Sequence, residues 1–212
     1  MLRDEVLKQI KDTGIIPVVR ATTADEAMRA IDAIREGGIA VLEITMTVPG
    51  AVGVIEQVCA RFGNDALVGA GTVLDAETAK ACISAGAQFI VSPALNMDTI
   101  AYCRERDVAV MPGALTPTEV VQAWNAGADF VKIFPAGAVG GASYLKALKA
   151  PLPQIELVPT GGVSLKTAAD FIKAGAAALG VGTDLVDVKA QAASITERAK
   201  QFVEIVRQAR EH

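Results

Sequence analysis

The sequence predicts an α/β fold, a single (β/α)8 TIM barrel with an additional helix at the N-terminus. Short apolar runs of strand length, rich in β-branched residues, alternate with amphipathic helical segments at intervals of roughly 20–25 residues. Such alternation is typical of parallel strands covered by helices, and right-handed crossovers then allow an open doubly wound sheet or a closed barrel. About eight strand–helix units in 212 residues favour the barrel, whose lower size limit is about 200 residues. We therefore expect one barrel domain over residues 1–212.

The first half of the chain begins with a helix and continues in strand–helix units. A helix is predicted over residues 2–13 and ends at Gly14. The strand over residues 15–20 contains Pro17, which weakens that prediction. Thr23 and Glu26 form a capping-box pattern that starts the next helix, which ends near residue 36. A strand over 41–45, a helix over 51–62, a strand over 66–70 and a helix over 75–85 follow.

The second half repeats the same units with a recurring sequence at the joins. An Ala-Gly-Ala sequence, centred on Gly86, Gly127 and Gly175, ends a helix two or three residues before a strand begins. The predicted strands cover residues 89–92, 108–111, 129–135, 155–158 and 178–181, and the predicted helices cover 96–106, 116–125, 141–148, 164–174 and 193–210.

Composition excludes several classes of partner. The net charge is −4 and no basic cluster is present, which argues against a nucleic-acid partner. No apolar run reaches about 18 residues, so we expect no membrane partner. Residues 1–11 mix charged and apolar side chains without the apolar core of a signal peptide, and a cytoplasmic location is expected.

The cysteines and the histidine restrict the chemistry further. Cys59, Cys82 and Cys103 are isolated within helical patterns, so neither a disulfide framework nor a zinc site is expected. The only histidine is His212, which excludes a histidine-based triad and a histidine-ligated metal for a lone chain. There is no Walker loop, and the Gly69–Leu74 segment lacks the third glycine of a dinucleotide fingerprint. We expect neither a metal nor a nucleotide cofactor.

Lys132 stands in the middle of an apolar strand that follows Gly127 and ends at Pro135. Lysine is almost never fully buried unless it is paired or used. Burial disfavours an ammonium, and a neutral amine is a nucleophile that forms Schiff bases with carbonyl substrates. The alternative is a lysine on an edge strand, or one whose side chain extends to water.

Glu43 is the second ionisable residue within a strand. By alternation it shares a face with Val41 and Thr45, as Lys132 does with Phe130. The interior of a closed barrel is the face on which such a charge meets a partner. Glu43 could serve only as a structural counter-charge, but a buried ion pair seldom adds net stability.

The C-terminal ends of barrel strands, where active sites lie, carry an unusual set of residues. Gly161-Gly162 follows the seventh strand and Gly182-Thr183 follows the eighth, the two loops in which barrels often bind phosphate. Each loop alone could be an ordinary glycine turn, but both together favour a phosphate site. The other strand ends carry Arg20, Thr45, Gly71-Thr72, Ser92-Pro93, Pro112-Gly113 and Thr160.

Six short motifs, in order along nearly the whole chain, resemble the 2-keto-3-deoxy-6-phosphogluconate (KDPG) / 4-hydroxy-2-oxoglutarate aldolase family. They are Leu42-Glu43-Ile44-Thr45, Gly69-Ala70-Gly71-Thr72-Val73, Phe89-Ile90-Val91-Ser92-Pro93, Met111-Pro112-Gly113, Val131-Lys132-Ile133-Phe134-Pro135 and Pro159-Thr160-Gly161-Gly162-Val163. The resemblance implies a class I, metal-free pyruvate aldolase of the Entner–Doudoroff type, on a (β/α)8 barrel that is commonly a homotrimer.

The resemblance also implies roles for single residues. Lys132 would form the imine with the pyruvyl carbonyl, and Glu43 would transfer protons during carbinolamine formation and C–C cleavage. The substrate-binding set would be Arg20 and Thr72 at the pyruvate carboxylate, Pro93 and Thr45 in the pocket, Thr160 at a substrate hydroxyl, and Gly161, Gly162, Gly182 and Thr183 at the distal phosphate.

Thr47 departs from the family pattern, because some members have an arginine there. Arg20 could supply that cation, and the preferred sugar epimer, in the gluconate or galactonate series, stays open. The expected reaction releases pyruvate and glyceraldehyde 3-phosphate, or glyoxylate, from a phosphorylated keto acid. Two alternatives are a phosphate-binding isomerase or synthase with Glu43 as the base, and a non-catalytic assembly subunit on the same barrel.

Overall fold

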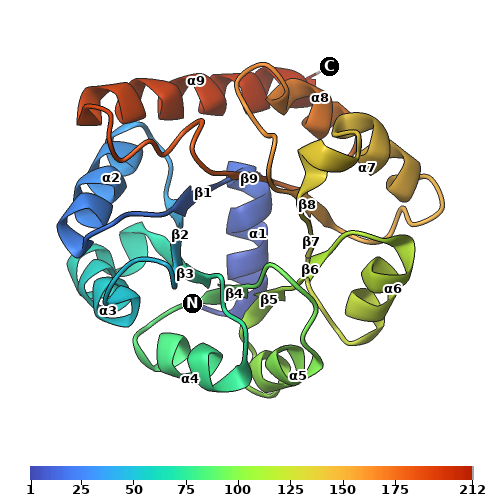
Figure 1. Ribbon diagram of the computed structural model, residues 1–212, viewed down its shortest axis with the longest axis horizontal. Helices are drawn as coiled ribbons and strands as arrows, with labels where there is room; N and C mark the ends of the chain where they lie inside the picture. Colours follow the sequence, from blue (N-terminus) through green and yellow to red (C-terminus); the bar gives the residue numbers. More distant parts are fainter. Residues whose placement is uncertain (212) are drawn as a thin grey trace.

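The computed structural model describes residues 1–211, and His212, the only histidine of the sequence, lies outside them. Parallel strands lie around the middle of the molecule and helices surround them (Figure 1). The helix α1 (Arg3–Thr13) lies across the middle in this view. None of the helices within the described residues is both long enough and apolar enough to cross a membrane.

The strands form two parallel sheets. The larger sheet has the order β5-β4-β3-β2-β1-β9 and the smaller has the order β6-β7-β8. The predicted α/β class with parallel strands is therefore confirmed, although the strands divide between two sheets. The bounds are β1 (Ile15–Val19), β2 (Val41–Thr45), β3 (Leu67–Gly71), β4 (Phe89–Val91), β5 (Ala109–Met111), β6 (Gly113–Ala114), β7 (Val131–Ile133), β8 (Leu157–Pro159) and β9 (Leu179–Val181).

The two sheets approach each other at both of their edges. On one side, β5 and β6 are separated only by Pro112, which has no backbone N–H and so interrupts the ladder. The Pro112 carbonyl still accepts a hydrogen bond from the Lys132 amide at 2.9 Å. On the other side, isolated parallel bridges pair Leu157 with Ala176 and Thr160 with Gly180. The sequence predicted neither the break at Pro112 nor β6 as a separate element.

Side-chain caps place the helix starts close to where the sequence predicted them. Thr23, Asp75, Asn96 and Thr116 each accept a hydrogen bond from the amide three residues later. Two 3-10 helices, η1 (Gly63–Asp65) and η2 (Ala136–Val139), were not predicted. The helices after α1 are α2 (Ala24–Glu36), α3 (Ala51–Phe62), α4 (Ala76–Ser84), α5 (Met97–Glu105), α6 (Pro117–Asn125), α7 (Ala142–Lys149), α8 (Ala168–Lys173) and α9 (Ala192–Glu211).

The helix α8 is shorter than the predicted helix over residues 164–174. The Thr167 hydroxyl accepts a hydrogen bond from the Ser164 amide at 2.9 Å, and residues 164–167 form a turn. The Ser164 carbonyl accepts the amides of Thr167 at 3.1 Å and Ala168 at 2.9 Å, and α8 begins directly after this turn.

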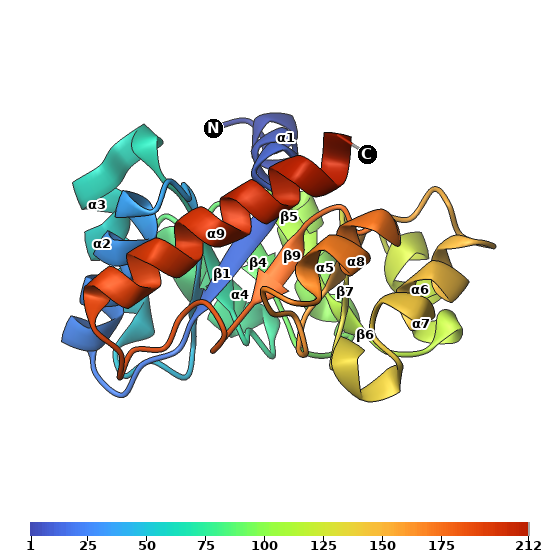
Figure 2. The same cartoon turned by 90° about the horizontal axis from the view of Figure 1, so that it is seen from above.

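The inward strand faces and α1 form one buried cluster. It includes Val41, Phe89 and Phe130 from the strands, together with Val6 and Ile10 of α1. A second cluster packs the outward faces of the strands against the surrounding helices. Only Gly14 separates α1 from β1, so α1 lies at the N-terminal ends of the parallel strands. Figure 2 shows α1 at this end of the molecule, with the loops that follow the strands at the opposite end.

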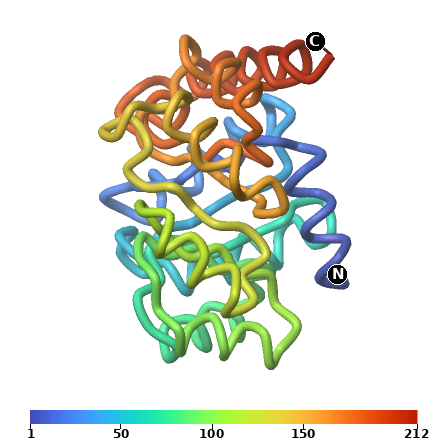
Figure 3. The backbone as a smooth tube through the Cα atoms, turned by 90° about the vertical axis from the view of Figure 1, so that its right-hand side faces the viewer, coloured from blue at the N-terminus to red at the C-terminus, as the bar shows by residue number. Residues whose placement is uncertain are grey.

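Polar contacts fix α1 at this end. Arg3 forms an ion pair with Asp129, whose side chain is buried and also accepts the Val110 amide at 2.9 Å. Arg210, near the end of α9, donates to the carbonyls of Lys11 at 2.5 Å and Asp12 at 2.8 Å. Both ends of the chain consequently lie on the α1 side (Figure 3). The opposite end, where the strands finish, is where a site can be reached.

Candidate active site

Glu43 in β2 and Lys132 in β7 are the two ionisable side chains in the interior of the strands. Each is 2% exposed. Val41 and Phe130 belong to the inner cluster, so alternation along each strand places Glu43 and Lys132 on that same inner face. The protein therefore holds an acid and an amine away from bulk water, next to the C-terminal ends of the strands.

The environment of Glu43 favours its neutral form. Burial raises the pKa of Glu43 above its usual range, and the charges of Lys132 and, after it, Arg20 oppose that rise. Within residues 1–211, the Oε1 atom of Glu43 is buried and has no hydrogen-bond partner. A buried oxygen without a hydrogen-bond partner costs stability. We therefore interpret the Glu43 Oε1 atom as an acceptor that a bound substrate can pair with.

Gly71, at the end of β3, leaves the space that the Glu43 carboxylate occupies. A Cβ atom at Gly71 would overlap Oε1 of Glu43 and lie 2.7 Å from its Cδ atom. The sequence motif around Gly71 marked this strand end, but reasoning from the sequence did not name the glycine as a site residue. Its signal was a glycine at a strand end, where a close approach is one of several possible reasons.

Lys132 is held between backbone neighbours and an aromatic ring. Its partners in the strand register are Gly113 and Val158. Its Nζ atom lies 5.3 Å from the centroid of the Phe134 ring, a distance at which an ammonium and a ring attract each other. The backbone of Pro93 packs directly against Gly113, because a Cβ there would collide with it. Pro93 thus lies beside the strand position opposite Lys132.

Two threonines near Glu43 differ in what holds them. Thr45 is fully buried, and its hydroxyl donates to the Val19 carbonyl at 3.0 Å and lies 2.6 Å from the Thr47 hydroxyl. Thr72 follows Gly71 with φ +59°, which is rare for a β-branched residue. Such an outlier persists only where its surroundings enforce it, and outliers of this kind cluster at functional sites.

A cavity of about 200 Å³ lies where the ends of β1, β7, β8 and β9 meet. Six of the residues predicted as substrate-binding line it, namely Arg20, Thr160, Gly161, Gly162, Gly182 and Thr183. The structure does not place Thr45, Thr72 or Pro93 in its wall. Phe134, the ring beside the Lys132 amine, also lines this cavity and connects the two parts of the site.

The glycine loop of this cavity has a backbone that favours glycine. Gly161 and Gly162 have φ values of +82° and +81°. Gly162 packs backbone to backbone against Gly137 of η2, since a Cβ at Gly162 would lie 2.7 Å from the Gly137 Cα atom. The Gly137 amide also donates to the Gly161 carbonyl at 2.8 Å. The loop after Lys132 therefore supports the loop after β8, a contact that the sequence did not reveal.

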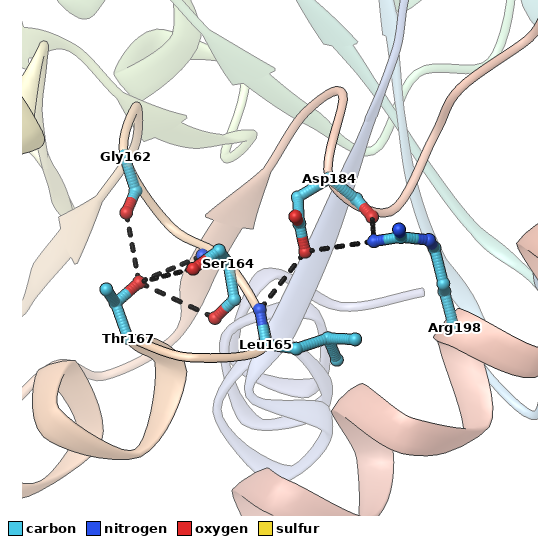
Figure 4. Close-up of polar contacts among 6 residues, drawn as sticks. All are labelled: Gly162, Ser164, Leu165, Thr167, Asp184 and Arg198. Atoms are coloured by element: carbon cyan, nitrogen blue, oxygen red, sulfur yellow. Dashed lines mark hydrogen bonds and ion pairs between the residues drawn. The ribbon is translucent and has the colours of Figure 1, made fainter.

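Asp184 and Arg198 are site residues that sequence reasoning missed. Asp184 lines the cavity directly after Thr183, and it contacts Arg198 of α9 and the Leu165 amide (Figure 4). The only local signal was an acidic residue immediately after a predicted phosphate loop. Within residues 1–211, no group of three or more His, Cys, Asp or Glu side chains is arranged to hold a metal ion.

Comparisons with known proteins agree across the chain. A family model described as KDPG and KHG aldolase matches residues 6–201. The 2-dehydro-3-deoxy-phosphogluconate aldolase of Treponema pallidum is 36% identical over 170 residues, 79% of each chain. The 2-dehydro-3-deoxy-6-phosphogalactonate aldolase of Escherichia coli is 36% identical over 196 residues, 92% of this chain and 95% of the relative.

Solved structures also match over most of this chain. A native KDPGal structure superposes with a TM-score of 0.88 at 36% identity and covers 93% of this chain and 96% of its own. A KDPG aldolase from Legionella pneumophila, with pyruvate captured as a covalent carbinolamine intermediate, has a TM-score of 0.80 at 27% identity over 96% of this chain and 97% of its own. A protein cage designed by fusing symmetric oligomeric domains has a TM-score of 0.88 at 36% identity, over 93% of this chain and 73% of the cage chain.

Proposed function

The chain belongs to the KDPG and KHG aldolase family, and on that premise we propose that it is a class I aldolase whose Schiff base forms on Lys132. Its substrate is 2-keto-3-deoxy-6-phosphogluconate, or a close 2-keto-3-deoxy or 4-hydroxy-2-oxo acid. The products are pyruvate and glyceraldehyde 3-phosphate, or glyoxylate. The observation that carries this proposal is the pair of buried ionisable groups, Lys132 and Glu43, next to a cavity lined by two glycine loops.

The first half of the reaction builds the imine. The Lys132 amine attacks the keto carbon, and as the C–N bond forms the nitrogen loses a proton and the carbonyl oxygen takes one up. The resulting carbinolamine loses water to give a protonated imine, which draws electrons from the adjacent carbons. Because burial raises the pKa of Glu43, this residue can hold the proton that the departing hydroxyl needs. The carbinolamine captured in the Legionella relative supports this order.

The second half breaks the carbon–carbon bond. The Glu43 carboxylate takes the proton of the C4 hydroxyl, the C3–C4 bond breaks, and its electron pair moves into the imine to give an enamine. The phosphorylated aldehyde is released. Protonation of the enamine at C3 and hydrolysis of the imine then release pyruvate and restore the Lys132 amine. Buried surroundings strengthen each of these electrostatic effects.

The remaining site residues hold the two ends of the substrate. We assign the phosphate to the cavity of Gly161, Gly162, Gly182 and Thr183, and a substrate hydroxyl to Thr160. Arg20 lines that cavity and also acts electrostatically on Glu43, so it lies between the phosphate end and the reacting end. Thr72, Pro93 and Thr45 bound the pyruvyl end near Gly71 and Gly113. Remote phosphate binding then positions the reacting carbons.

At the level of the whole chain, we propose one closed (β/α)8 barrel domain over residues 1–212, which assembles as a cytoplasmic homotrimer. The approach of the two sheets at Pro112 and at the Thr160–Gly180 bridge supports closure of the barrel. Leu74 and Met97 are 58% and 47% exposed, so these apolar side chains are free to take part in a subunit contact. The similar cage protein was designed from symmetric oligomeric domains, which supports assembly. A charged phosphorylated acid does not diffuse across membranes, which favours the cytoplasm, and the similarity to KDPG aldolases favours an Entner–Doudoroff type of pathway.

Borohydride trapping with pyruvate tests the assignment of Lys132. Reduction of the imine should add one pyruvyl-derived group to Lys132, as mapped by mass spectrometry, and EDTA should leave turnover intact. Lys132→Met should abolish trapping, whereas Lys146→Met, which removes an exposed lysine of α7, should not. Trapping on another lysine would contradict the assignment of the imine to Lys132, whereas the absence of any trapping would contradict the Schiff-base mechanism and favour the isomerase or synthase alternative.

The same assay format defines the substrate. Turnover of 2-keto-3-deoxygluconate with and without the 6-phosphate, and of the galactonate epimers, should show a preference for a phosphorylated acid. Pyruvate trapping with no turnover of any of these acids would instead favour a different aldehyde product. A protein that neither traps pyruvate nor is stabilised by phosphate would fit the non-catalytic assembly subunit.

A further inference from the structure

We propose that Arg198 of α9 neutralises Asp184 at the wall of the phosphate cavity, and that this pair sets the affinity for phosphorylated substrates. This inference rests on the proposed aldolase function and on its phosphate site. Among the described residues 1–211, Asp184 is the one acidic residue that lines the cavity. A carboxylate at that wall repels a phosphate dianion unless a cation compensates it.

Arg198 provides that compensation through two contacts with one residue. Its Nη1 atom lies 3.3 Å from Oδ2 of Asp184 and donates to the Asp184 backbone carbonyl at 2.5 Å. The side chains of Arg198 and Asp184 are 41% and 33% exposed, so the pair is partly screened by water. Because Arg198 also binds the backbone carbonyl of Asp184, it fixes the position of Asp184 in addition to compensating its charge.

Asp184 in turn joins the two loops of the cavity. Its Oδ2 atom accepts the Leu165 amide at 3.1 Å, which attaches the β9 loop to the segment that follows Gly162. In that segment the Thr167 hydroxyl donates to the Gly162 carbonyl at 3.0 Å (Figure 4). Arg198, Asp184 and Leu165 thus form a continuous connection from α9 to the glycine loop.

Arg198 and Asp184 are therefore positioning residues, and neither is assigned to the reacting atoms. If charge compensation is their main role, removal of the cation leaves a repelling carboxylate, and removal of that carboxylate should reverse the defect. If they act only as a mechanical connection, removing both should be at least as harmful as removing one. A double-mutant cycle distinguishes these outcomes.

The experiment compares Arg198→Met, Asp184→Asn and the double variant, with phosphorylated substrate turnover and pyruvate trapping as readouts. Arg198→Met should raise KM for the phosphorylated acid by about threefold to fivefold, the size of effect expected from one partly exposed charge. The rate of pyruvate trapping should stay near wild type, because pyruvate carries no phosphate. Asp184→Asn keeps an acceptor for the Leu165 amide, and combined with Arg198→Met it should bring KM back to within about twofold of wild type.

Two controls keep the outcomes separate. Arg207→Met removes another ion-paired arginine of α9, one bound to Glu204 and Glu211, and should leave KM unchanged. If Arg198→Met folds poorly, Arg198→Lys serves as the second variant. It keeps the charge and should retain most of the affinity for the phosphorylated acid. A double variant no better than Arg198→Met alone, or an unchanged KM in folded Arg198→Met, would overturn the inference. Absence of trapping in the wild-type protein would instead refute the aldolase function.

Discussion

Replacing Gly71 with alanine should displace the proton-transfer group without touching Lys132. The new Cβ would overlap the Glu43 Oε1 atom and lie 2.7 Å from Cδ, so the carboxylate must rotate or the strand must shift. Overpacking of this kind costs about 1–3 kcal/mol of stability. A positioned acid–base group contributes roughly 10²–10⁴-fold to a rate, so kcat should fall by about 10²-fold.

Steady-state cleavage, borohydride trapping and chemical denaturation together test this expectation. Gly71→Ala should still trap pyruvate on Lys132, but more slowly. The matched control is Gly53→Ala in α3, where nothing lies within 4 Å of the added methyl. That control should keep its activity and gain about 0.5–1 kcal/mol of stability. The reasoning fails if folded Gly71→Ala keeps kcat within about threefold of wild type, or if its loss simply adds to that of Glu43→Gln.

Three further predictions concern the acid, the glycine loop and the α1 end. Burial raises the pKa of Glu43, so the folded state gains protons relative to the unfolded chain and its stability falls as pH rises from about 4.5, the usual value, through the raised pKa. Glu43→Gln should remove that decline and lose turnover. In chemical denaturation, its free energy of unfolding relative to wild type should therefore be higher at pH 8 than at pH 5. A variant less stable than wild type at pH 8 would contradict this. Gly162→Ala, with φ +81° and its methyl 2.7 Å from the Gly137 Cα atom, should raise KM for phosphorylated acids while pyruvate trapping persists; equal loss of both would argue against a phosphate role. Arg210→Met removes donors to the last carbonyls of α1 and should lower Tm by about 2–4 °C at unchanged kcat, whereas a loss of activity would show that the two ends are coupled.

Local patterns in the sequence were sufficient for most of the elements. The predicted ranges for β2 and α3 match the structure residue for residue, because clear turn residues separate them and their apolar periodicity is regular. The prediction was less accurate where a local interaction competed with the pattern. Residues 164–167 form a turn ahead of α8, and Pro112 separates β5 from β6. The missing N–H of Pro112 contributes to the break at that edge of the sheets, whereas at the other edge β8 and β9 are joined only by isolated bridges.

The candidate site was predictable to the extent that it follows strand ends. The rule that barrel sites lie at the C-terminal ends of strands brought Arg20, Thr160 and the loop glycines to one cavity. It could not find Gly137 against Gly162, or Arg198 against Asp184, because those contacts join segments whose pairing no local pattern encodes. The role of each of these residues in binding substrate stays a prediction, and Thr45, Thr72 and Pro93 do not line this cavity.

The position of α1 restricts where substrate enters and where products leave. The amphipathic helix α1 covers the N-terminal end of the strands and packs Val6 and Ile10 into the inner cluster, so we expect substrate to enter and products to leave at the C-terminal end. In the proposed reaction the three-carbon keto fragment would be bound to buried Lys132, while the phosphorylated aldehyde would lie in the cavity of the glycine loops. We therefore expect an obligatory sequence in which the aldehyde departs first and pyruvate leaves last, and in the condensing direction pyruvate must arrive before its partner.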